Sequence, residues 1–134
     1  MPTVLIVEDN PLNFRVFAKI LSKGGGINVK GSEDASEVVN LARSGEIDAI
    51  LMDISLKNRT YEGKAVDGIK ITQMIKKYPE CSSLPIILLT AHAMDGDRDK
   101  FLKQSGADGY ISKPIPHPQD FIALVLAWIN NNHS

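Results

Sequence analysis

The sequence predicts an α/β fold, a doubly wound parallel sheet with helices on both faces. Strand-like and helix-like segments alternate five times along the 134 residues, without an internal repeat. At the centre, residues 49–52 are continuously apolar and lead into Asp53, a pattern typical of a strand buried on both faces. A chain of this length buries roughly two thirds of its unfolded surface, so we expect residues 1–134 to form a single domain.

The first strand is predicted at residues 3–7 and the first helix at residues 11–23. Asn10 can cap this helix, and Pro11 suits its first position because its missing N–H needs no partner there. Three glycines at 24–26 end the helix. Its expected apolar face consists of Leu12, Val16, Phe17, Ile20 and Leu21, and is widened by Phe14 and Ala18.

The chain next predicts a strand at residues 27–31, a helix at residues 33–43 and a strand at residues 47–53. The strand at 27–31 has few apolar residues, which favours an edge position in the sheet. The helix is expected to close at Gly45. Its inward residues are expected to be Ala35, Val38, Val39 and Ala42.

Residues 55–66 have neither a helical nor a strand period and are rich in Lys, Asn, Arg, Thr and Gly. We therefore expect an exposed loop there. Asp67-Gly68 precedes a helix that Pro79 ends. A fourth, largely apolar strand is predicted at residues 84–90.

The rest of the chain predicts a helix at residues 94–105, a strand at 110–112 and a helix at 118–130. The first of these helices has few apolar residues and contains Gly96, so we expect it to be a unit of low stability. The last helix has no polar residue from 121 to 129. Such a helix is normally covered on both sides.

Composition excludes several classes of function. The formal net charge of -1 gives no electrostatic case for binding nucleic acid or an anionic membrane. The longest apolar run is far shorter than the ~20 residues that a membrane helix needs. The first residues carry no signal-peptide pattern, and the single cysteine, Cys81, cannot form an internal disulfide. We expect a cytoplasmic protein in which Cys81 is a spectator.

Polar residues follow the predicted strands at their carboxyl ends, and these ends meet at one edge of a parallel sheet. They are Glu8, Asp9, Asp53, Thr90 and Lys113. Three neighbouring carboxylates repel one another unless a cation lies between them, and all-oxygen ligands suit Mg²⁺. Taken alone, Glu8 and Asp9 could instead compensate the positive end of a helix. Zinc is not expected, because the histidines at 92, 117 and 133 are scattered.

This set of residues suits phosphoryl transfer. A carboxylate such as Asp53 can act as a nucleophile and form an aspartyl phosphate. The transferred group carries negative charge on its equatorial oxygens and needs a metal and fixed donors around them. Glu8 and Asp9 would hold the metal, while Thr90 and Lys113 would reach the remaining oxygens.

Four segments carry a resemblance to a known family: Val-Glu8-Asp9-Asn-Pro, Leu-Met-Asp53, Leu-Leu-Thr90-Ala91 and Ile-Ser-Lys113-Pro114. Together they resemble the receiver domain of two-component response regulators, over nearly the whole chain. The resemblance implies a CheY-like, flavodoxin-like sheet with strand order 2-1-3-4-5 and five helices. It further implies a signalling protein rather than an enzyme.

The resemblance also implies roles for individual residues. Asp53 would accept a phosphoryl group from a histidine kinase or a histidine phosphotransfer protein, with Mg²⁺ bound in part by the main-chain carbonyl of Ser55. Thr90 and Tyr110 would form the switch pair. The peptide bond between Lys113 and the following proline is usually cis in this family.

Two departures from the family pattern stand out. Lys57 occupies a position where the family usually has proline, and the loop that follows Asp53 is longer than is typical. The chain also ends with the receiver, so we expect a stand-alone protein that signals through contacts with a downstream effector protein.

Two alternative functions remain open. A phosphatase or phosphotransferase with an aspartyl nucleophile often has a general acid two residues on, where this chain has Ser55. A pseudo-receiver would act purely as a binding module.

Three surfaces are candidates for binding partners. Family kinases commonly dock on the first helix, where Phe14 and Ala18 widen the apolar face. The loop at 57–66 is either a tolerated insertion or a docking loop with Arg59 and Tyr61 as anchors. On the last helix Leu124 and part of Trp128 point away from the sheet, and this face is either covered within the chain or used by a homodimer or an output protein.

Overall fold

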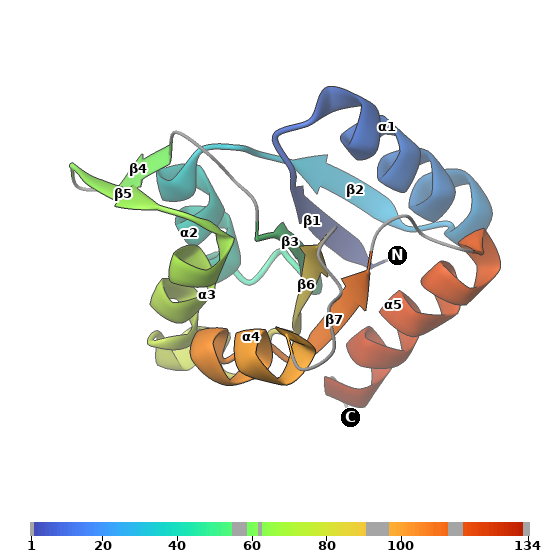
Figure 1. Cartoon of the computed structure of the whole chain (residues 1–134). Coiled ribbons are helices and arrows are strands. Elements are labelled where there is room, and N and C mark those ends of the chain that lie inside the picture. The colour runs from blue at the N-terminus through green and yellow to red at the C-terminus, as the bar shows by residue number, and fades with distance from the viewer. Residues whose placement is uncertain (1, 55–58, 62, 91–96, 113–116, 133–134) are drawn as a thin grey trace.

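The computed structural model describes residues 2–54, 59–61, 63–90, 97–112 and 117–132 (Figure 1). At its centre is a five-stranded parallel sheet in the order β2-β1-β3-β6-β7, which is 2-1-3-4-5 when only the strands of this sheet are counted. The strands are β1 (Thr3–Val7), β2 (Asn28–Gly31), β3 (Ala49–Asp53), β6 (Ile86–Thr90) and β7 (Gly109–Ser112). The predicted fold class is confirmed. Strands β3 and β6 are buried at every position, as their apolar sequences require.

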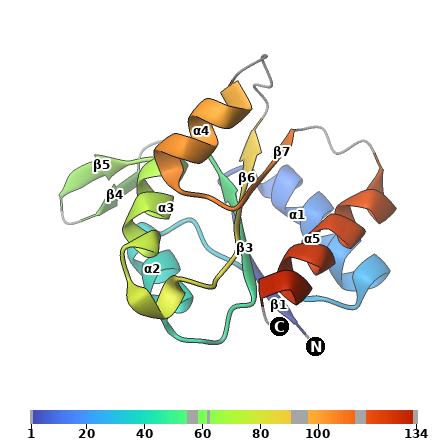
Figure 2. The same ribbon diagram turned by 90° about the horizontal axis from the view of Figure 1, so that it is seen from below.

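Helices cover both faces of the sheet (Figure 2). On one face lie α1 (Pro11–Lys19) and α5 (Pro118–Asn132), and on the other α2 (Ala35–Arg43), α3 (Gly68–Lys76) and α4 (Asp97–Ser105). Each layer has its own apolar cluster, with the strand residues alternating between the two clusters. None of the described helices is both long enough and apolar enough to span a bilayer.

The main error in the sequence prediction is the expected loop at residues 55–66. Two short strands, β4 (Arg59–Tyr61) and β5 (Lys64–Val66), pair antiparallel there and form a hairpin beside α2 and α3 (Figure 1). Gly63 has φ 82°, a left-handed conformation that glycine adopts without strain, and it lies in the hairpin turn. Residues 55–58 and 62 lie outside the described part of the chain.

The first helix begins as predicted, with the Asn10 side chain accepting from the backbone N–H groups of Leu12 and Asn13. Its last turn differs, because Ile20–Gly24 forms a π-helical turn. The predicted apolar face was partly wrong: Leu12 is 69% exposed and Val16 47% exposed. The side that meets the sheet carries Phe14, Phe17, Ala18 and Leu21.

Close packing explains why this side of the helix is buried. The Phe14 ring lies directly over Gly31 at the end of β2, where any Cβ atom would overlap the ring. Gly31 thus leaves room for Phe14 at the edge of the sheet. Leu12 and Val16, one turn apart, are left on the outer side of α1.

The other boundaries differ from prediction by a few residues. Helix α2 starts at Ala35 because the side chain of Asp34 caps it, and a 3₁₀ turn at Pro79–Cys81 follows α3. The predicted helix at 94–105 is described only from residue 97. Cys81 is fully buried and its thiol donates to the carbonyl of Ala42 at 3.4 Å, as befits a packing residue.

Two aspartates fasten neighbouring strands at the amino edge of the sheet, opposite the predicted site. Asp48, just before β3, accepts from the N–H of Thr3 at 2.7 Å and donates its own N–H to the carbonyl of Thr3 at 2.8 Å. Asp108, just before β7, makes the same pair of bonds with Ile86, each at 2.8 Å. In addition, its carboxylate pairs with Lys76 of α3 at 2.7 Å. Each aspartate thereby fixes the register of two parallel strands at their starts.

Candidate functional site

The register of the sheet brings the predicted site residues to one edge. Val7 pairs with Met52, so Glu8 and Asp53 follow at the same level on adjacent strands. Asp53 in turn pairs with Leu89, and Thr90 is the next residue of β6. The carboxyl ends of β1, β3 and β6 therefore supply three of the predicted side chains together.

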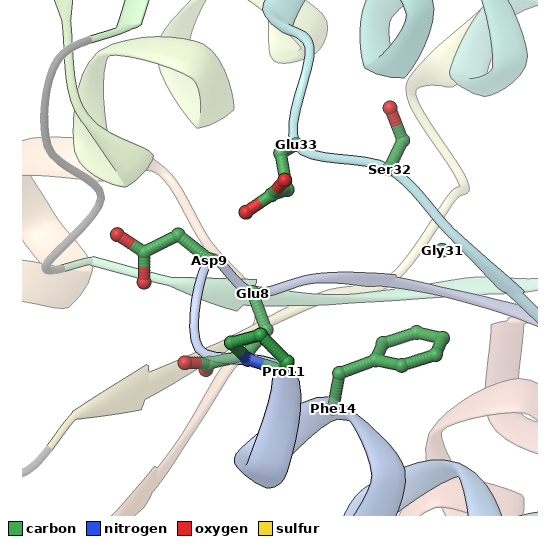
Figure 3. A pocket seen from close by; sticks show the side chains of 7 residues that line it. All are labelled: Glu8, Asp9, Pro11, Phe14, Gly31, Ser32 and Glu33. Carbon is green, nitrogen blue, oxygen red and sulfur yellow. The ribbon is translucent and has the colours of Figure 1, made fainter.

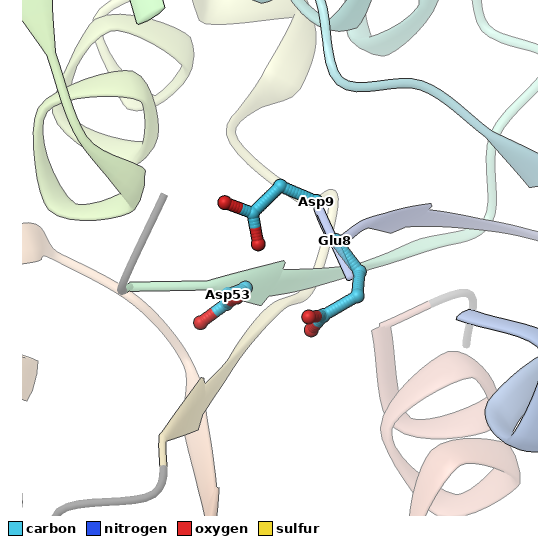
Figure 4. A group of neighbouring side chains, drawn as sticks. All are labelled: Glu8, Asp9 and Asp53. Atoms are coloured by element: carbon cyan, nitrogen blue, oxygen red, sulfur yellow. The ribbon is translucent and has the colours of Figure 1, made fainter. Parts of the chain in front are cut away.

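Glu8, Asp9 and Asp53 form a compact group of carboxylates around the end of β3 (Figure 4). One oxygen from each lies within 4.8 Å of the others. Glu8 is 4% exposed and Asp53 2% exposed, whereas Asp9 is half-buried. The Glu8 carboxylate accepts from the backbone N–H of Asn10 at 3.3 Å and from the side-chain amide of Asn13 at 3.4 Å. These bonds hold the Glu8 carboxylate against the start of α1.

The donor set fits a small hard cation. Three carboxylates this close, two of them largely removed from water, repel one another unless positive charge lies between them. Mg²⁺ takes one or two carboxylates and keeps several waters, which matches an all-oxygen group with one partly exposed member. Among the residues that the structure describes, Glu8, Asp9 and Asp53 are the acids that gather in this way.

A cavity of about 330 Å³ opens beside the carboxylates, between the start of α1 and the end of β2 (Figure 3). Phe14 and Pro11 contribute apolar surface to it, and Asp9 and Glu33 contribute acidic side chains. The lining residues are Glu8, Asp9, Pro11, Phe14, Gly31, Ser32 and Glu33. Two of the three carboxylates, Glu8 and Asp9, thus line an open cavity beside α1.

One residue that shapes the site was missed as a site residue. Gly68, the first residue of α3, lies so close to the main chain of Asp53 and Ile54 that a Cβ atom would overlap the Asp53 carbonyl oxygen. The helix also needs Asp67, whose side chain accepts from the N–H of Lys70 at 2.8 Å. Asp67-Gly68 reads in the sequence simply as a helix start, and nothing local shows that the glycine touches the strand carrying Asp53.

The predicted switch pair lies on one face of the sheet. Thr90 is fully buried at the end of β6 and is opposite Ser112, while Tyr110 is half-buried and opposite Leu88. Both residues point to the side covered by α2, α3 and α4, diagonal to each other across two strands. The other predicted site residues, Ser55 and Lys113 with its peptide bond to proline, lie outside the described residues.

The predicted partner-binding residues are distributed as follows. Phe14 and Ala18 are half-buried against the core rather than presented outward, and Leu124 on α5 is 43% exposed. Trp128 is half-buried because its indole packs where Gly109 of β7 lacks a side chain. The side chains of Arg59 and Tyr61 in the hairpin lie outside the described atoms.

Comparison with known proteins agrees with this geometry. Residues 4–126 match the response regulator receiver domain family. The polar-differentiation response regulator DivK of Brucella anthropi is 35% identical over 129 residues, which cover 96% of this chain and 97% of that protein. DivK of Brucella ovis is equally similar over the same extent.

Solved structures give the same result. The receiver domain of the sensor histidine kinase PA1611 from Pseudomonas aeruginosa, crystallised with a magnesium ion in its active site cleft, is 33% identical with a TM-score of 0.79, covering 96% of this chain and 98% of that one. The chemotaxis protein CheY4 of Vibrio cholerae, at 20% identity and a TM-score of 0.77, shares the fold over 95% of this chain and 98% of its own. The predicted resemblance is thus confirmed: this chain belongs to the family of response regulator receiver domains.

Proposed function

We propose that this protein is a phosphoacceptor switch in which Asp53 receives a phosphoryl group from a histidine kinase or a histidine phosphotransfer protein. The observation that carries the proposal is the carboxylate group Glu8, Asp9 and Asp53 at the carboxyl edge of the sheet. Asp53 ends a fully buried strand, so its carboxylate is held at a fixed place on the site's floor. A preorganised nucleophile beside a cation site is what phosphoryl transfer needs.

In the transfer, a carboxylate oxygen of Asp53 attacks the phosphorus atom of the donor. The new oxygen–phosphorus bond forms as the bond from phosphorus to the donor's histidine nitrogen breaks, and the nitrogen keeps the electron pair. Glu8, Asp9 and Asp53, with the Ser55 carbonyl, would hold Mg²⁺, which neutralises charge on the transferred oxygens. Thr90 and Lys113 are proposed as donors to those oxygens.

The experiment uses acetyl phosphate as a small donor, so that no kinase has to be known. With Mg²⁺ present, intact-mass spectrometry is expected to show one added phosphoryl group. Asp53→Asn should abolish the addition, and Asp9→Asn should raise the Mg²⁺ concentration needed for it. Asp120→Asn, an exposed position in the first turn of α5, is the matched control and should behave as the parent does.

The Asp53→Asn variant distinguishes the supporting result from the refuting one. Loss of phosphorylation in Asp53→Asn, with Asp120→Asn unaffected, supports the acceptor role. Equal phosphorylation of the Asp53→Asn protein, or phosphorylation that persists after Mg²⁺ is chelated, would refute the proposed site.

The donor is proposed to dock beside α1. Leu12 and Val16 form an exposed apolar pair one turn apart on its outer side. The same helix contributes Pro11 and Phe14 to the cavity beside Asp9. The residues predicted to widen the docking surface, Phe14 and Ala18, face the core instead. The docking surface therefore moves to the outer side of the same helix.

The output is proposed to pass through protein contacts with a downstream effector, in the cytoplasm, from a receiver domain that spans residues 1–134. Thr90 and Tyr110 would carry the change from the phosphoryl group to the surface around α4. Leu124 on α5 offers an exposed apolar contact for a homodimer or an effector. The kinase-side surface would then lie on α1, and the output-side surface on α4 and α5.

A further inference from the structure

Among its described residues, the outer helix α4 buries few side chains against the rest of the molecule. Of its side chains that the structure describes, Ser105 is buried, Phe101 and Leu102 are half-buried, and the others are exposed. The Ser105 hydroxyl is used locally, accepting from the N–H of Ala107 at 3.1 Å. A polar tie comes from Gln73 of α3, whose amide donates to the carbonyl of Gln104 at 2.6 Å. Within the described part of α4, Phe101 is the residue that packs on the core cluster of this face.

Phe101 meets that cluster through Tyr110. The two rings are stacked, with centroids 6.4 Å apart and planes inclined by only 13°. Offset stacking at this separation is a favourable arrangement for an aromatic pair. Tyr110 belongs to β7 and points to the same side of the sheet as Thr90. Thr90, at the strand end next to Asp53, thus lies on the same side of the sheet as Tyr110 and Phe101.

We propose that Phe101 is a positioning residue of the switch: its ring, stacked on Tyr110, ties α4 to β7, so that a displacement of the tyrosine displaces the helix. The inference rests on the proposed phosphorylation of Asp53 for its trigger, but the ring pair exists without phosphate. Because Phe101 is the described residue of α4 that packs on the core cluster of this face, loss of the ring should both loosen α4 and disconnect it from β7.

Trp128, on the opposite side of β7, can serve as a fluorescent probe of this strand. Gly109 precedes Tyr110 and faces the other layer, where the indole of Trp128 occupies the space that a side chain would take. Trp128 is the only tryptophan in the sequence. Its fluorescence therefore reports on β7 without contribution from α4, which lies across the sheet (Figure 2).

The first arm of the test needs no phosphate. Amide exchange of residues 97–105 is compared in the parent, Phe101→Leu, Tyr110→Leu and the double variant, with Leu102→Ala as a control on the same helix. Loss of an aromatic pair should speed exchange in α4 by about two- to tenfold in either single variant. The double variant should be no faster than the singles, whereas additive effects would overturn the ring pair as a tie.

The second arm adds acetyl phosphate and Mg²⁺, with phosphorylation followed by intact mass. In the parent, both the Trp128 emission and the α4 exchange rate should change. In Phe101→Leu, phosphorylation and the Trp128 change should remain while the α4 change is largely lost. An undiminished α4 change would overturn the proposal. A parent protein that accepts no phosphoryl group would overturn the switch role together with the proposed function, a result that the mass measurement identifies separately from failure of the ring pair in the first arm.

Discussion

Asp108 offers a sharp test of how the sheet is held together, because its carboxylate serves two partners. It accepts from the N–H of Ile86 at 2.8 Å and pairs with the ammonium of Lys76 at 2.7 Å. Lys76 has a second partner, the carbonyl of Leu84 at 3.0 Å. Asp108→Ala therefore leaves the N–H of Ile86, the first residue of β6, without this acceptor. Lys76 keeps its hydrogen bond to the carbonyl of Leu84.

The expected cost follows from these contacts. A hydrogen bond to a charged group contributes about 1.5–3 kcal/mol, and the partly exposed ion pair adds at most ~1 kcal/mol. Asp108→Ala should thus lower the free energy of unfolding by about 2–4 kcal/mol. Asp108→Asn retains an oxygen that can accept from Ile86 but loses both the ion pair and the charge on that acceptor, so its cost should be about 1–2 kcal/mol.

Urea unfolding followed by Trp128 fluorescence measures these differences. With a denaturant dependence of roughly 1–3 kcal/mol per molar, Asp108→Ala should lower the urea midpoint by about 0.7–4 M. Glu80→Ala is the matched control, since it also removes an ion pair, with Arg43 at 2.9 Å, but both of those side chains are more than 40% exposed. It should change the midpoint far less, because solvent screens exposed pairs. Equal shifts for Asp108→Ala and Glu80→Ala would refute the reasoning.

Three further predictions concern the switch, the hairpin and the thiol. Thr90→Ala should still accept phosphate from acetyl phosphate but lose most of the phosphate-dependent exchange change in α4, and an undiminished change would contradict the coupling. Shortening residues 59–64 should leave phosphorylation by acetyl phosphate unchanged but slow phosphoryl transfer from the cognate kinase. Equal kinase-driven rates for the shortened and native proteins would show that the loop is only an insertion. Burial raises the pKa of the Cys81 thiol from its ordinary 9.0, so a disulfide reagent should label it far faster in urea than in the folded protein. Because the thiol's pKa is higher in the folded state than in the unfolded state, the protonated thiol stabilises the fold fully below pH 9.0. This stabilisation is lost as pH rises through the folded-state pKa. In Cys81→Ala the urea midpoint should lack this part of its pH dependence.

The sheet and the carboxylate group were predictable because both depend on short-range patterns. A run such as residues 49–52 has no polar atom to place in water, so its burial on both faces follows from the sequence. Parallel strands then bring their carboxyl ends to one edge, whatever the details of the loops. Glu8, Asp9 and Asp53 come together for that reason.

The features that escaped prediction depend on contacts between distant segments. Helix α1 carries two apolar stripes, and the packing of Phe14 over Gly31 accompanies burial of one stripe, leaving Leu12 outside. The hairpin pairs Thr60 with Ala65 in strands of three residues, too short to show a period. The need for glycine at position 68 comes from the main chain of Asp53, fifteen positions earlier in the sequence.

The two edges of the sheet have a consequence for how natural variants of this protein should be read. Asp48 and Asp108 fasten the amino edge and take no part in the carboxylate group at the other edge. A substitution at either aspartate should act through protein abundance, because a less stable fold is degraded in the cell while the surviving molecules remain competent. A substitution at Asp9 should leave abundance unchanged and weaken the signalling of the molecules that are present. Protein level and signalling output, measured side by side in cells, would therefore assign a variant to one edge of the sheet or the other.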